Sequence, residues 1–263
     1  MKKSTRLAST VGLIAFFIVL VFAATAIAQK DKRDKGGMPD VEDWVIMTYI
    51  PDNGYTVPVP LPVTKSGGGV AFDFYPTPDR AMLLSSDKDS IKELHAGNLK
   101  GKSLSAKISI VASPGATFNY FNNDGTGSLQ GGSADPGGFV RLYFQTGKTT
   151  GWDPDDYKGN AQYWWSNPIH IDLIDLAARG ENGITLQVPL DPDSWSDRDG
   201  HMGTDKIIID GKLYDHTKLF NKATDRVTKV GLSFGGDGWF AFGCGVNAPS
   251  TAVFKLNDFK VIK

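Results

Sequence analysis

The chain has 263 residues, with 28 Lys and Arg against 29 Asp and Glu, and its formal net charge at pH 7 is −1. A near-neutral chain without a basic block argues against a nucleic-acid-binding protein and against binding to an anionic membrane surface. The single cysteine, Cys244, excludes an internal disulfide and a cysteine-based zinc cluster. We expect Cys244 to be a small buried residue, because no neighbouring His or Lys activates its thiol.

The amino-terminal segment has the three parts of an export signal. Three basic residues within the first six precede an apolar run over residues 11–24, and small residues follow at the positions that a signal peptidase reads. We therefore predict cleavage between Ala28 and Gln29 and export to the periplasm or beyond. The alternative is an uncleaved membrane anchor, but such an anchor needs about 20 apolar residues. After cleavage we expect no transmembrane span.

The rest of the chain favours strands over helices. Residues 29–41 are polar and charged, which predicts a disordered leader. No internal repeat or linker-like stretch divides residues 42–263, so we expect a single domain there. The chain has 26 Asp but only three Glu, and helices favour Glu whereas turns favour Asp.

Five segments alternate apolar and polar residues with the period of two that is typical of half-buried strands: 104–110, 140–145, 184–190, 229–234 and 252–257. The apolar residues then change parity, which predicts a β-bulge near Asn257 and Asp258. Further strands are predicted at 44–50, 69–74 and 162–165, and short helices at 89–96, 171–178 and 215–223. The pattern predicts an all-β protein, an antiparallel two-sheet β-sandwich (jelly roll) with few short helices.

One face of the strand predicted at 140–145 is richer in rings and hydrogen-bonding groups than a face made only for solvent. Tryptophans follow this strand in the sequence. The adjacent Trp164 and Trp165 must point to opposite faces of their own strand. Sugars suit such a surface, because their C–H faces stack on rings while their hydroxyls bind polar side chains. The alternative is that the tryptophans are packing residues. The predicted ligand-binding residues, expected on an open outer face, are Arg141, Tyr143, Gln145, Trp152 and Trp164.

Aspartates crowd two predicted turns. Calcium takes about six to eight oxygen ligands, and Asp-rich loops supply them. Neither cluster matches an EF-hand loop, so the alternative is a pair of solvated turns. The candidate calcium ligands are Asp153, Asp155, Asp156, Asp197 and Asp199.

The sequence carries no recognisable catalytic motif: a nucleophile elbow, a zinc-protease helix and a phosphate-binding loop are all absent. The four histidines, His95, His170, His201 and His216, lie far apart without metal-ligand spacing. A glycosidase needs two facing carboxylates, and 26 aspartates single out no pair. We therefore expect a non-catalytic protein.

Three stretches give the chain a resemblance to a known fold family. They are residues 97–106, residues 141–145 leading to 163–166, and the closing pair 230–236 and 254–261. Together they resemble carbohydrate-binding-module-like jelly rolls of the galactose-binding type over roughly residues 97–262. The resemblance implies a sandwich fold, a sugar-binding face and, in many members, a structural calcium ion. We expect this chain to stand alone without an attached catalytic domain, which is unusual for a module that targets an enzyme.

These observations lead to three functional hypotheses. The first is an exported, non-catalytic β-sandwich that binds a carbohydrate or another polar ligand through its aromatic and polar face. The second is an exported, envelope-associated structural or protein-interaction domain, whose partner is another envelope protein. The third is a polysaccharide hydrolase or lyase with Asp residues as acid and base.

Overall fold

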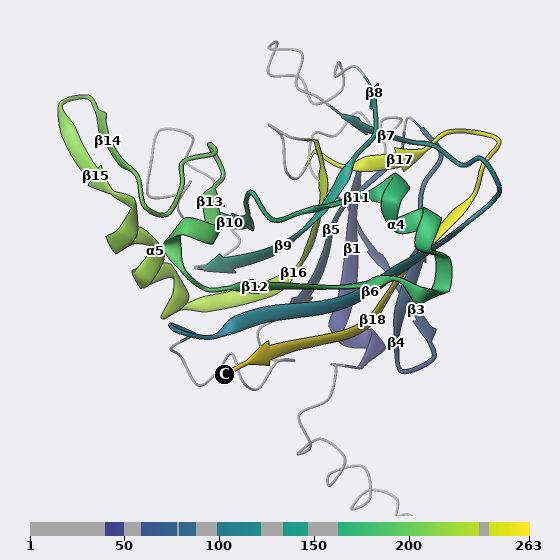
Figure 1. Cartoon of the computed structure of the whole chain (residues 1–263), viewed down its shortest axis with the longest axis horizontal. Helices are drawn as coiled ribbons and strands as arrows, with labels where there is room; N and C mark the ends of the chain where they lie inside the picture. The colour runs from purple at the N-terminus through teal and green to yellow at the C-terminus, as the bar shows by residue number, and fades with distance from the viewer. Residues whose placement is uncertain are drawn as a thin grey trace, which may run out of the picture. The chain divides into compact units, whose positions relative to one another are not determined.

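Two antiparallel β-sheets packed face to face form the body of the protein in a computed structural model (Figure 1). The structure describes residues 40–49, 59–77, 79–87, 99–121, 134–146, 163–236 and 242–263. They all fall within one compact unit, Met38–Lys263. This arrangement confirms the predicted all-β, antiparallel sandwich.

The larger sheet, sheet A, has eleven strands. Its main path runs β13 (Trp195–Asp197), β10 (Tyr163–Ser166), β9 (Phe139–Thr146), β16 (Val227–Gly235), β5 (Arg80–Asp87), β17 (Cys244–Val246), β7 (Phe118–Phe121) and β8 (Ala134–Pro136). Off this path, β1 (Trp44–Tyr49) pairs with β5 and with β2 (Val59–Pro62), and β11 (Ile171–Asp172) pairs with β9.

The smaller sheet, sheet B, runs β12 (Ile184–Pro189), β6 (Ser103–Ala112), β18 (Ala252–Ile262), β4 (Gly69–Asp73) and β3 (Thr64–Ser66). A separate hairpin, β14 (Lys206–Ile209) and β15 (Lys212–Asp215), extends beyond α5 at the left of Figure 1. The register between β18 and β6 shifts between Leu256 and Asp258, which confirms the predicted bulge.

Helices are few and short. The predicted helices at 171–178 and 215–223 are confirmed as α4 (Leu173–Arg179) and α5 (His216–Thr224), whereas the one at 89–96 lies outside the described residues. The 3-10 turns are η1 (Val41–Asp43), η3 (Gly180–Asn182) and η4 (Pro192–Ser194). Among the described helices, none combines the length and the apolar character needed to cross a bilayer.

The core lies between the two sheets and is rich in aromatic rings. Phe72 and Phe254 from sheet B meet Phe234 from sheet A, with ring centroids 5.6 and 5.0 Å apart. These edge-to-face contacts join the sheets, since such ring pairs stabilise a core beyond the area they bury. Cys244 is also fully buried, as predicted, and burial raises the pKa of its thiol.

Gly231, on β16 between β5 and β9, leaves room for its neighbours. A Cβ atom there would lie 1.9 Å from the Leu84 carbonyl oxygen and 3.1 Å from the Tyr143 ring. We expect Gly231→Ala to lower the free energy of unfolding by about 1–3 kcal/mol, because backbone must shift to admit the methyl group. Urea denaturation checks this, with Gly68→Ala as control, because a Cβ there would meet nothing within 4 Å. Equal stability of the two variants would contradict the prediction.

Candidate functional site

The face of sheet A that points away from sheet B, here called the second face of sheet A, carries the polar side chains of β9. Arg141, Tyr143 and Gln145 alternate there, and they are 0, 1 and 4 % exposed. The Arg141 Nη1 atom donates to the Gly236 carbonyl oxygen at 3.1 Å, and the Tyr143 hydroxyl donates to Ser85 Oγ at 2.5 Å. The expectation that these side chains lie on an open surface is therefore wrong: they form a buried polar layer.

The tryptophan on this face is Trp165, not Trp164. In the register of β10 and β9, Trp165 lies opposite Tyr143 and Trp164 lies opposite Phe144. Trp164 is fully buried in the core, with its ring centroid 5.0 Å from that of Phe220. The predicted place of Trp164 on the ligand-binding face is thus wrong. Sequence alternation placed the two tryptophans on opposite faces but did not say which face belonged to which residue.

Two residues that the sequence reasoning missed extend the second face of sheet A. Tyr163 stacks on Trp165, with ring centroids 6.0 Å apart and planes 15° apart. Burial raises the pKa of Tyr163, and the positive charge of the Arg198 guanidinium lowers it. The period-two alternation of residues 163–165 and of residues 196–198 would have predicted that Tyr163 and Arg198 lie on this face.

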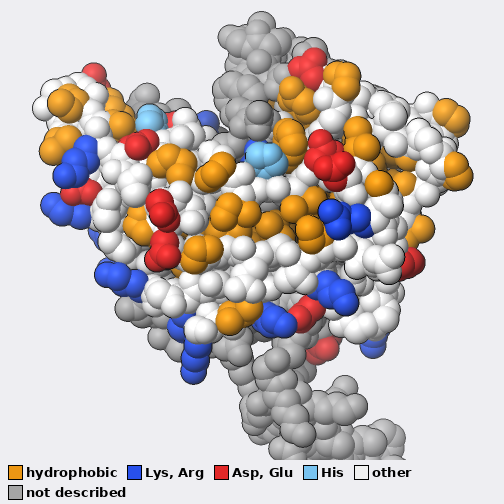
Figure 2. Space-filling model, in the orientation of Figure 1, with side chains coloured by type: hydrophobic (Ala, Val, Ile, Leu, Met, Phe, Trp, Pro, Cys, Tyr) orange, Lys and Arg blue, Asp and Glu red, His pale blue; other side chains and the backbone are white. Residues whose placement is uncertain are grey.

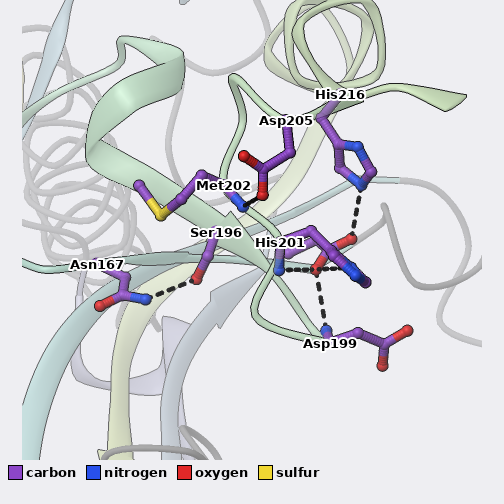
Figure 3. Close-up of polar contacts among 8 residues, drawn as sticks. Asn167, Ser196, Asp199, His201, Met202, Asp205 and His216 are labelled. Carbon is purple, nitrogen blue, oxygen red and sulfur yellow. Dashed lines mark hydrogen bonds and ion pairs between the residues drawn. The ribbon is translucent and has the colours of Figure 1, made fainter. Parts of the chain in front are cut away.

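A second cluster lies at the β13 edge of sheet A, where Asp197 meets two imidazoles (Figure 3). The Asp197 side chain is fully buried, and its Oδ1 atom accepts the backbone amides of Asp199 at 3.0 Å and His201 at 2.9 Å. Oδ1 also lies 3.5 Å from His201 Nδ1, and Oδ2 lies 3.2 Å from His216 Nε2. One carboxylate therefore fixes the turn after β13 and joins both histidines.

The position of His216 is set by the start of α5. Asp215 caps this helix by accepting the Lys218 amide at 3.3 Å, and the His216 amide donates to the Asp205 carbonyl oxygen at 2.9 Å. The Asp205 carboxylate in turn accepts the Met202 amide at 2.8 Å. These bonds tie the loop between β13 and β14 to the helix that carries His216 (Figure 3).

Burial dominates the electrostatics of this cluster. It raises the pKa of the Asp197 carboxyl above its ordinary value, and the neighbouring His201 offsets part of the rise. It lowers the pKa of His216, which is fully buried, below its ordinary value. Both shifts favour the uncharged form of the group concerned, because burial removes the water that would stabilise a charge.

The structure does not gather Asp197 and Asp199 as a pair of calcium ligands. Asp199 binds Asp197 through its backbone amide, and its exposed side chain points away from the two imidazoles (Figure 3). Asp197 faces nitrogen donors instead. The inference that the histidines lack metal-ligand spacing is wrong for His201 and His216, which the fold brings together. The other predicted site residues, Trp152, Asp153, Asp155 and Asp156, lie outside the described residues.

Comparisons with known proteins identify no family for this chain. No family model matches the sequence, and no curated protein matches it. Among the solved structures similar to this chain is one that matches over 87 % of this chain and 95 % of its own, at 12 % identity and a TM-score of 0.36. It is described by the words "Prominent members of the human gut microbiota express endo-acting O-glycanases to initiate mucin breakdown". A likeness of this degree supports no conclusion about function.

Proposed function

We propose that this protein is an exported, non-catalytic β-sandwich that binds a carbohydrate or another polar ligand on the second face of sheet A. The observation that carries the proposal is the layer of rings and hydrogen-bonding side chains on this face. Its residues are Arg141, Tyr143, Gln145, Tyr163, Trp165 and Arg198. Stacked rings and flanking amide and guanidinium groups match the alternating apolar and polar faces of a sugar.

Sheet B shows what an ordinary solvent-facing strand surface looks like in this protein. Its outward side chains include Lys107, Thr185 and Gln187, all exposed, and Lys255, whose Nζ atom lies 2.6 Å from Glu181 Oε1. The second face of sheet A instead carries buried aromatic and polar groups. The two sheets therefore differ in the chemistry of their outer faces, and on sheet A solvent reaches the layer at the half-buried Tyr163 and Arg198.

Gln145 provides the most specific support. Its Nε2 atom is buried, and within the described part of the chain it has no hydrogen-bond acceptor. Buried polar groups are nearly always paired, and leaving one unpaired costs about 1–3 kcal/mol. A ligand hydroxyl or carbonyl oxygen would satisfy this amide once the buried layer opens beside its half-buried members, Tyr163 and Arg198.

The full chain, screened against a panel of neutral and acidic polysaccharides by affinity electrophoresis, tests the proposal. For a polysaccharide that retards the protein, we expect Gln145→Ala to weaken binding by about tenfold, the effect of one lost hydrogen bond. The matched control is Gln187→Ala, a glutamine exposed on sheet B, which should bind like the wild type. Retardation by no polysaccharide, with or without calcium, or equal affinity of the two variants, would contradict the proposal.

One observation favours the second hypothesis, a protein-interaction domain. The β14–β15 hairpin exposes Ile208 by 72 % and Leu213 by 60 %, and Figure 2 shows hydrophobic side chains at this end of the molecule. Apolar side chains displayed on a projecting hairpin are typical of a contact surface. Co-purification of a stoichiometric envelope protein, lost in an Ile208→Ser and Leu213→Ser double variant, would support this function.

A further inference from the structure

We propose that Asp197, His201 and His216 form a binding centre for a divalent transition-metal ion of the zinc class. The centre lies at the β13 edge of sheet A and goes beyond the ligand-binding function proposed above. Each of the three residues offers one ligand atom, and these atoms all lie within 4.8 Å of one another. The chain brings them together from the last residue of β13, the turn that follows it and the first residue of α5.

The distances suit a tetrahedral ion. Zinc binds His nitrogen and carboxylate oxygen at about 2.0–2.1 Å, so two ligand atoms at the corners of a tetrahedron lie about 3.3 Å apart. The observed separations are 3.2 Å between Asp197 Oδ2 and His216 Nε2, and 3.5 Å between the other carboxylate oxygen, Oδ1, and His201 Nδ1. One ligand atom from each residue lies within 4.8 Å of the other two, somewhat wider than a tetrahedral edge. Small side-chain movements would therefore bring the three residues around one ion.

The ligands are held in place before any ion binds. Asp197 is fixed by the two backbone amides of its own turn. His216 is anchored by its amide bond to Asp205, and its ring packs 6.5 Å from the ring of Trp164. Ligands held by their surroundings lose little conformational freedom on binding, which favours affinity.

The donor set also selects the kind of ion. Two imidazole nitrogens and one carboxylate oxygen suit zinc and its first-row neighbours, whereas calcium requires six or more oxygen ligands. His201 is 34 % exposed in its side chain, while Asp197 and His216 are buried. Three protein ligands leave a fourth position for water or another oxygen donor, and the His201 side is where solvent reaches the centre.

Cobalt(II) added to the chelator-treated full chain tests the proposal, because its visible absorption reports coordination geometry. We expect one cobalt ion per chain with the strong absorption of a tetrahedral site, displaced by zinc and not by calcium. His201→Ala should weaken binding of cobalt and zinc by at least about 100-fold, more than the loss of an outer-shell partner causes. The control is His170→Ala, a histidine that packs on the Phe139 ring instead; it should bind like the wild type.

A thermal melt provides a second readout in the same proteins. An ion that binds the folded chain raises its melting temperature, so zinc should raise that of the wild type and of His170→Ala but not that of His201→Ala. His201 is the residue to replace because it is the least buried of the three. Absence of bound cobalt and zinc in the folded wild type, or equal affinity in His201→Ala, would overturn the proposal. Neither outcome depends on polysaccharide binding.

Discussion

Replacing Trp164 with alanine is expected to lower the free energy of unfolding by about 3–5 kcal/mol, the usual effect of removing a large buried ring. Trp164 has no exposed surface, and it contacts the rings of Phe144 and Phe220, with centroids 6.4 and 5.0 Å away. Its loss would leave a cavity between sheet A and α5 that the surrounding rings cannot fill by small movements. Urea denaturation followed by far-ultraviolet circular dichroism measures the change without depending on tryptophan fluorescence.

Trp165→Ala is the natural comparison, because the two tryptophans are neighbours on one strand. Trp165 belongs to a small hydrophobic cluster on the second face of sheet A, whose other buried member among the described residues is Tyr143. We expect this variant to lose less stability than Trp164→Ala and to bind the polysaccharide ligand more weakly. A larger loss of stability in Trp165→Ala would show that the second face of sheet A is a packing surface.

Sequence periodicity predicted the sandwich well, because a strand with one buried face must alternate. The segment 252–257 became β18, and even its bulge was visible as a change of parity at Asn257. Helix α5 was foreseen from a short stretch between strands. Local chemistry determines such elements, so one sequence is enough to place them.

The candidate site was harder to predict, because burial and long-range contacts decide it. Alternation put Arg141 and Tyr143 on one face but did not indicate that this face is buried. His201 and His216 are fifteen residues apart in a spacing that matches no metal motif. They meet because the β14–β15 hairpin extends outward and returns the chain to α5 beside β13, which no local pattern shows.

Asp197→Ala is expected to lower the free energy of unfolding by about 3–5 kcal/mol, because each buried donor left without its acceptor costs about 1–3 kcal/mol. The substitution removes the acceptor for two backbone amides and the partner of the buried His216 imidazole. These donors would then have no acceptor in a site with little access to water, and an unpaired buried donor lowers the stability of the folded state. Unfolding should be measured in excess chelator, so that a bound metal ion contributes nothing to the difference.

Asp199→Ala is the matched control, because Asp199 lies in the same turn with an exposed side chain that points away from the histidines (Figure 3). An exposed substitution of this kind changes stability by no more than about 0.5 kcal/mol. Asp197→Asn should fall between the two, since its amide oxygen still accepts the backbone amides while its NH₂ group replaces the oxygen facing His216. If Asp197→Ala and Asp199→Ala unfold at the same urea concentration, the Asp197 carboxylate does not organise this turn. The inference that Asp197 holds His201 and His216 in place would then be wrong as well.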